Sequence, residues 1–137
     1  MSITSKVIRK CSVPEMHSIG TIAANFGNLE FYIELAIWQL LKLPPEDMEV
    51  GHAVTVGMSF KSKVNALASG YRLRFPEEEE TVLKDLVADL FRVEEKRNAI
   101  VHSGWFYSEE SGQFGRVKSS ARAKQGLKTR VTSPVQR

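Results

Sequence analysis

The stretch Thr81-Val-Leu-Lys-Asp-Leu-Val-Ala-Asp-Leu-Phe-Arg-Val-Glu-Glu-Lys-Arg-Asn-Ala-Ile-Val-His102 carries apolar residues at the spacing of an α-helix. Three- and four-residue steps join the members of one seam, which are Leu83, Leu86, Leu90 and Val93. Such a repeat predicts a helix that buries one face. Proline suits the first turn of a helix and acids suit its amino end, so Pro76 and the four glutamates at 77–80 predict where this helix opens.

The same seam continues to Arg97 and Val101, which places Arg97 near the buried side of the helix. A cation brought toward a core is costly unless it is paired or holds an anion. One interpretation is therefore a functional arginine. The alternative is a structural salt bridge, either with Glu94 one turn earlier or with an acid on another helix.

Two further helices are predicted before this one. Ser12 and Glu15 have the spacing of a capping box, and an apolar stripe follows them to about Leu43, where Pro44 and Pro45 end the helix. Ser59 can cap another helix, whose exposed face we expect to show Lys61 and Lys63. Residues 46–58 read as a connection with room for one helical turn. The fold class predicted is all-α, a four-helix or near four-helix up-down bundle.

Beyond the helix, Ser103 and Gly104 interrupt the pattern. Aromatic and branched residues at 105–107 and 113–117 flank a glycine-containing turn, which predicts a short β-hairpin. The rest of the tail, from Ser119 onward, is polar and basic and reads as irregular and flexible. We therefore divide the chain into a lead-in at 1–11, a helical domain at 12–104, and an aromatic hairpin with a basic tail at 105–137.

Charge is unevenly distributed. Residues 111–137 hold seven Lys and Arg and no Asp or Glu, although the whole chain has a net charge of only +3. Such asymmetry is typical of polyanion binding, and equally of a solvated tail or one that docks on an acidic partner. The tail residues that we expect to contact nucleic acid are Arg116, Lys118, Arg122 and Lys124.

Composition limits the remaining classes. At 137 residues the chain has room for one domain. No apolar run is long enough for a membrane span, and no secretory signal is recognisable at the start, so the expected location is cytoplasmic. Cys11 is the sole cysteine, which excludes an internal disulfide and a thiolate metal cluster. We expect neither a metal nor a cofactor, because Asp47, Asp85 and Asp89 are too scattered to form a metal centre.

The segment from Glu94 to Trp105 resembles the Arg-Asn-x-x-x-His signature of the HEPN superfamily, with Arg97, Asn98 and His102 at the signature positions. The resemblance covers roughly residues 12–106. It implies a helical bundle that pairs through its motif-bearing helices. It also implies a metal-independent endoribonuclease in a toxin, antiviral or RNA-processing system, with RNA and an antitoxin or other protein as partners.

Roles for the three motif residues follow from the resemblance. His102 moves protons, Arg97 holds the charge that develops on the phosphoryl oxygens, and Asn98 orients the imidazole or adds a hydrogen bond to the phosphate. On one continuous helix Arg97 and His102 diverge by roughly 140°, so a symmetric homodimer is the simplest way to assemble the site. The alternative is a non-catalytic HEPN-like module that binds a protein or nucleic acid, with His102 idle at a helix end.

Overall fold

The computed structural model describes residues 13–108, 113–122 and 126–132. Within these ranges the helices are α1 (Val13–Leu40), α2 (Met48–Thr55), α3 (Phe60–Arg74) and α4 (Glu80–Val101), with a short 3-10 helix, η2 (Pro45–Asp47), before α2. By packing, the chain forms two units, one of Ala23–Arg97 and one that combines Met1–Ile22 with Asn98–Arg137. None of the described helices combines the length and the apolar character that crossing a bilayer requires. The predicted all-α class is confirmed.

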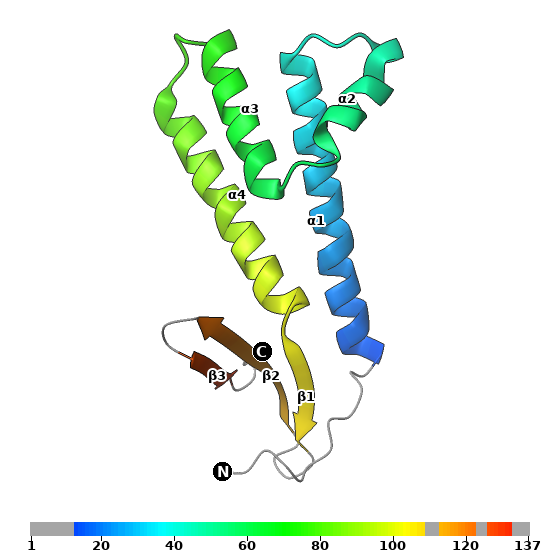
Figure 1. Ribbon diagram of the computed structural model, residues 1–137, viewed down its shortest axis with the longest axis vertical. Helices are drawn as coiled ribbons and strands as arrows, with labels where there is room; N and C mark the ends of the chain where they lie inside the picture. Colours follow the sequence, from blue (N-terminus) through cyan, green and yellow to red (C-terminus); the bar gives the residue numbers. More distant parts are fainter. Residues whose placement is uncertain (1–12, 109–112, 123–125, 133–137) are drawn as a thin grey trace. The chain divides into compact units, whose positions relative to one another are not determined.

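In the unit of residues 23–97 the helices alternate in direction along the chain, as expected for an up-down bundle (Figure 1). Its buried core joins three helices through Phe26, Ile33, Ile37 and Trp38 of α1, Phe60 and Val64 of α3, and Leu90 of α4. Val87 and Phe91 of α4 pack against this core. The predicted seam was therefore half right, because Leu83 and Leu90 are buried whereas Leu86 and Val93 are exposed.

The sequence predicted the start of α3 correctly but not the start of α4. The hydroxyl of Ser59 accepts a hydrogen bond from the backbone N–H of Ser62 at 3.1 Å, so the predicted cap of α3 is confirmed. Ser12 lies outside the described residues. The predicted opening of α4 at Pro76 was wrong: the N–H of Glu78 bonds to the carbonyl of Phe75 in a turn, and the helix begins at Glu80.

Lys63 is buried, contrary to the expectation that it lies on an exposed face. Its ammonium donates hydrogen bonds to Glu30 at 2.7 Å and to Glu34 at 2.6 Å, two carboxylates one turn apart on α1. Burial alone raises the pKa of Glu34, but the hydrogen bond and charge of Lys63 outweigh it and hold this pKa below its usual value. A paired cation thus connects α1 and α3 inside the bundle.

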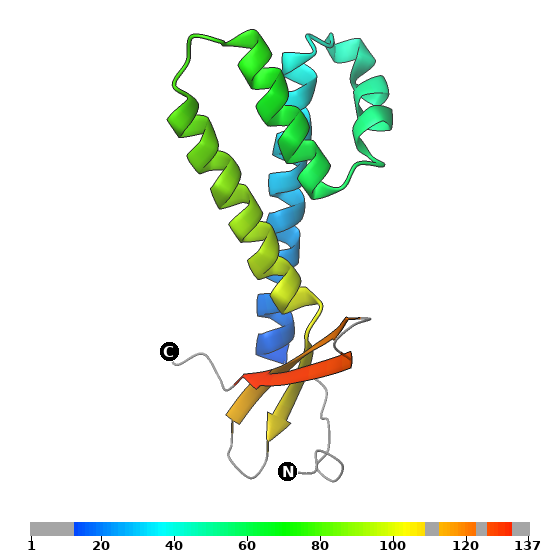
Figure 2. The same ribbon diagram turned by 60° about the vertical axis from the view of Figure 1, so that its left-hand side comes forward.

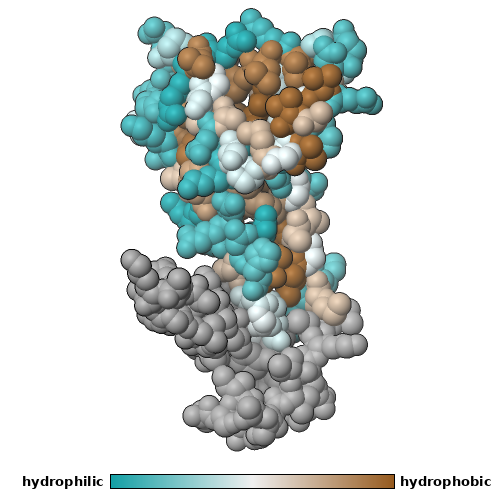
Figure 3. Space-filling model, viewed as in Figure 1, coloured by the Kyte–Doolittle hydropathy of each residue, from teal (hydrophilic) through white to brown (hydrophobic). Residues whose placement is uncertain are grey.

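The segment expected to be a connection contains α2. This helix lies close to α1, because a Cβ at Gly51 would come within 3.0 Å of the Trp38 ring. Only Gly51 and Thr55 of α2 are buried. Apolar residues gather around α2 and the end of α1 (Figure 3), and those with exposed side chains are Leu41, Met48, Val50, Val54 and Val56. We call these five residues the α2 patch.

The C-terminal strands are β1 (Gly104–Ser108), β2 (Gln113–Arg122) and β3 (Gly126–Thr132), and they form an antiparallel sheet with β2 in the middle (Figure 2). The predicted hairpin is confirmed, since Gly104 pairs with Val117 and Ser108 with Gln113. The irregular tail predicted from Ser119 is not found in the described residues 119–122 and 126–132, because β2 continues to Arg122 and β3 pairs along it. Its polar composition concealed this pairing.

Candidate functional site

Arg97 points toward the core, as its place in the apolar repeat predicted. Its guanidinium carbon lies 4.1 Å from the centre of the Phe26 ring on α1. Phe26 is itself buried and packs against the Phe60 ring of α3, with 4.6 Å between the ring centres. A cation over an aromatic face is attracted by the negative face of the ring. This contact places the guanidinium against the core without a carboxylate partner among the described residues.

Arg97 forms no ion pair within the described part of the chain, so the alternative of a structural salt bridge, with Glu94 or with an acid on another helix, is not found there. The Nε atom of Arg97 is buried and lacks a hydrogen-bond partner among the same residues. Leaving such a donor unsatisfied costs about 1–3 kcal/mol. Buried polar groups of proteins are nearly always bonded, and an exception calls for an explanation such as binding or catalysis.

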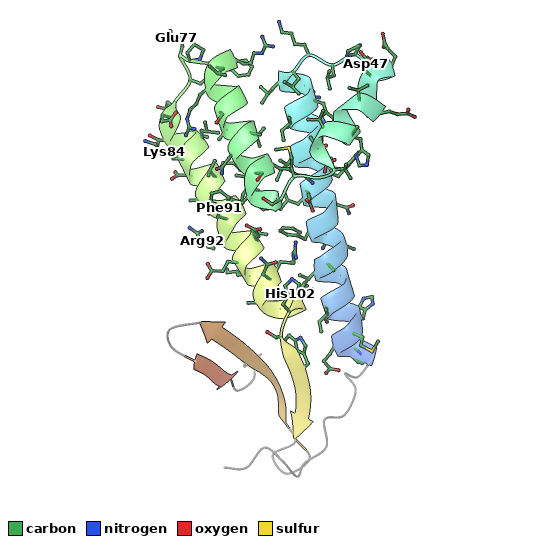
Figure 4. The ribbon with its side chains drawn as sticks, viewed as in Figure 1. Asp47, Glu77, Lys84, Phe91, Arg92 and His102 are labelled. Carbon is green, nitrogen blue, oxygen red and sulfur yellow. The ribbon has the colours of Figure 1, made fainter. Side chains whose placement is uncertain are left out.

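Asn98 lies in the last turn of α4. His102 directly follows the helix and lies at its carboxyl end (Figure 4). The backbone N–H of His102 still bonds to the Asn98 carbonyl, at 3.0 Å, so the backbone remains helical up to the histidine. Asn98 is half-buried and the His102 side chain is exposed. The imidazole is therefore accessible from outside the bundle.

Two side chains after the histidine close the end of α4. The Ser103 hydroxyl donates a hydrogen bond to the Ala99 carbonyl, and the indole N–H of Trp105 donates one to the Ile100 carbonyl at 3.0 Å. The last carbonyls of a helix have no partners within the helix, and these two donors satisfy a pair of them. Ser103 and Trp105 thereby fix the backbone on both sides of His102.

A second feature of α4 is an exposed apolar stripe. Val82, Leu86 and Val93 have 64%, 48% and 43% of their surface exposed. At 3.6 residues per turn the three positions fall within about 40° of one another around the helix. Arg97 lies about 20° beyond Leu86, on the side that faces the core. Arg97 therefore stands at the boundary between the buried face and this stripe, which we call the α4 stripe.

Of the four tail residues predicted to contact nucleic acid, Arg116, Lys118 and Arg122 lie on β2. Lys124 lies outside the described residues. Among the described His, Cys, Asp and Glu side chains, no three converge as ligands of a metal ion. Comparison with known protein families, curated proteins and solved structures finds no match for this chain.

Sequence reasoning missed the partners of the motif rather than the motif itself. In the sequence Phe26 belongs to the apolar stripe that precedes Leu43, and no local signal identifies it as the ring beneath Arg97. Trp105 was noted for its place after Gly104, but not as a hydrogen-bond donor to the helix end. Phe26 lies on α1 and Trp105 on β1, so the helical repeat of α4 carries no information on either contact.

The unsatisfied Nε of Arg97 allows a binding role to be distinguished from a structural one. Arg97→Met keeps an apolar chain over Phe26 and removes the unsatisfied Nε, so the free energy of unfolding in urea should stay within about 1 kcal/mol of the parent or rise. Phe26→Ala should lose about 3–5 kcal/mol as the control for core damage. A large loss of stability in Arg97→Met would mean that the guanidinium has a structural partner.

Proposed function

We propose that this protein is a metal-independent endoribonuclease of the HEPN kind that acts as a homodimer. The observation that carries the proposal is Arg97, a guanidinium held over a core aromatic ring without an ion pair in the described residues. Five residues later comes His102, an exposed imidazole at the helix end. Together they supply the two functions that phosphodiester transfer in RNA needs, charge stabilisation and proton transfer.

The proposed reaction is an internal transfer. The 2′-hydroxyl of a ribose attacks the adjacent phosphorus, a P–O2′ bond forms, and the P–O5′ bond breaks. His102 accepts the hydroxyl proton or delivers a proton to the departing 5′ oxygen. The products are a 2′,3′-cyclic phosphate and a 5′-hydroxyl, so no water, oxidant or metal is consumed.

Arg97 and Asn98 act on the phosphate in this scheme. The guanidinium is a planar fork of N–H donors that matches two phosphoryl oxygens at once. A bound phosphate supplies the acceptor that the described residues do not provide. Asn98, half-buried one residue further along α4, can donate its side-chain amide to the same phosphate or to the imidazole.

A second copy of the chain is the proposed partner of the α4 stripe. In a two-fold dimer the same surface of each copy meets its counterpart, so an apolar stripe along one helix is self-complementary. Because Arg97 borders the stripe, pairing through α4 would bring the arginines of both copies to the interface. The α2 patch is the competing apolar surface, and it carries no residue of the motif.

Cleavage by His102 can be tested directly. His102→Ala should lower the rate of single-stranded RNA cleavage in EDTA by about 10²–10⁴-fold, because a positioned proton-transfer group contributes that much. His17→Ala removes another exposed histidine and should cleave at the parent rate. Since both side chains are exposed, the melting temperature should stay unchanged in each. Undiminished cleavage by His102→Ala would reject the proposed role.

The dimer surface has a matched control. Leu86→Glu places a charge on the α4 stripe and should shift the protein from dimer to monomer in light scattering, with cleavage falling in parallel. Val54→Glu places the same charge on the α2 patch and should leave both unchanged. Should Val54→Glu alone dissociate the dimer, the interface would lie on α2 and the assignment to α4 would be wrong.

The second candidate function is a non-catalytic module that binds a protein partner, such as an antitoxin, or nucleic acid. The α2 patch favours it, because five exposed apolar side chains around one short helix are typical of a protein-binding surface. A chain of this kind would bind RNA or a partner without releasing cyclic-phosphate products, and His102→Ala would bind as tightly as the parent.

A further inference from the structure

The register of the sheet brings the basic residues of the tail together. Lys118 of β2 is directly opposite Arg130 of β3, and Ser120 is opposite Lys128. Successive residues of a strand alternate between the two faces of a sheet, and directly paired residues share a face. One face of the sheet therefore holds five cationic positions, namely Arg116, Lys118, Arg122, Lys128 and Arg130. We call it the basic face.

The other face has a different composition. Val117 is paired with Val131, and Ala121 with Leu127, at the positions between the cations. An antiparallel sheet commonly has one face that packs against a core and one that meets solvent or a ligand. The alternation in β2 and β3 follows this pattern and separates the charged positions from the apolar ones.

The like charges of the basic face disfavour pairing of the strands when no anion is bound. Like charges placed directly opposite each other destabilise an antiparallel pair, and Lys118 and Arg130 are such a pair. Residues 113–132 contain no Asp or Glu, so neither β2 nor β3 supplies a counter-charge. An anionic ligand that spans several of these positions would remove the repulsion.

The same face also has paired aromatic positions. Tyr107 of β1 is opposite Phe114 of β2, and Phe114 precedes Arg116 by two residues, so all three positions share the face. We propose that the basic face binds single-stranded RNA. Proteins bind single strands by combining a cationic track for the phosphates with aromatic rings on which bases stack. An acidic protein would account for the cations and leave the aromatic pair without a role.

This proposal stands apart from cleavage, and its test can be kept apart too. The probe is a labelled oligouridylate of about 16 nucleotides with 2′-O-methyl groups, which lacks the attacking hydroxyl and stays intact whether or not the protein is a nuclease. Binding is followed by fluorescence anisotropy over a range of salt concentrations. The parent should bind, with an affinity that falls steeply as salt rises.

Charge-matched variants locate the contact. Lys118→Gln/Lys128→Gln/Arg130→Gln should weaken binding at least tenfold and make the slope of log affinity against log salt shallower by about 2. Lys42→Gln/Lys61→Gln/Lys84→Gln removes three exposed charges from the unit of residues 23–97 and should bind like the parent. The single variants Lys118→Gln and Arg130→Gln should each reduce the slope by about 0.7. Circular dichroism should show parent-like folding and an unchanged or higher melting temperature, because repulsion is relieved.

Stacking is tested separately. Tyr107→Ala/Phe114→Ala should weaken single-strand binding roughly tenfold or more while leaving the salt slope unchanged. The proposal is overturned if the sheet and helix triple variants lose affinity equally, since net charge alone would then explain binding. It is also overturned if the parent prefers duplex RNA of equal phosphate number, or if it binds an acidic polypeptide and no RNA.

Discussion

The ring of Phe26 is the contact on which both the packing and the proposed chemistry depend. The ring packs against Phe60 of α3 in the core. It also contacts the guanidinium of Arg97 on α4. The same side chain therefore joins three helices and orients the arginine. Phe26 is buried, and Arg97 lies over its ring without an ion pair in the described residues. In the proposed reaction, a cation placed in this way would stabilise developing charge without having to reorganise.

Two cations in the unit of residues 23–97, Lys63 and Arg97, have different kinds of partner. Lys63 is buried with two carboxylates that satisfy it, and breaking such a pair leaves an uncompensated buried charge. Arg97 is half-buried with an aromatic ring in place of a carboxylate. The first arrangement satisfies the cation, whereas the second leaves the buried Nε of Arg97 without an acceptor among the described residues. This contrast between the buried Lys63 and the half-buried Arg97 is the physical reason for proposing a function for Arg97 and not for Lys63.

Sequence patterns predicted what depends on neighbouring residues. They gave the all-α class, the cap at Ser59, the hairpin after Gly104, and the direction of Arg97. They failed where distant segments decide. Lys63 is buried because Glu30 and Glu34 bind it from another helix. Leu86 and Val93 have the spacing of the buried residues of α4, but they lie on the adjacent, exposed face. β3 is defined by its pairing with β2, which the sequence of β3 alone does not show. The family resemblance, the motif roles and the domain boundaries stay predictions, as does every RNA contact.

The most direct test of the account concerns the free donors of Arg97. In a nitrogen-15 NMR titration of the intact protein with the 2′-deoxy form of a uridine dinucleotide, whose phosphodiester cannot be cleaved, the Nε–H signal of Arg97 should shift and saturate. Arg92, an exposed arginine paired with Asp89, is the internal reference and should move little. An Arg97 signal that stays fixed while other arginines respond would contradict the central claim that this guanidinium is held ready for a phosphate.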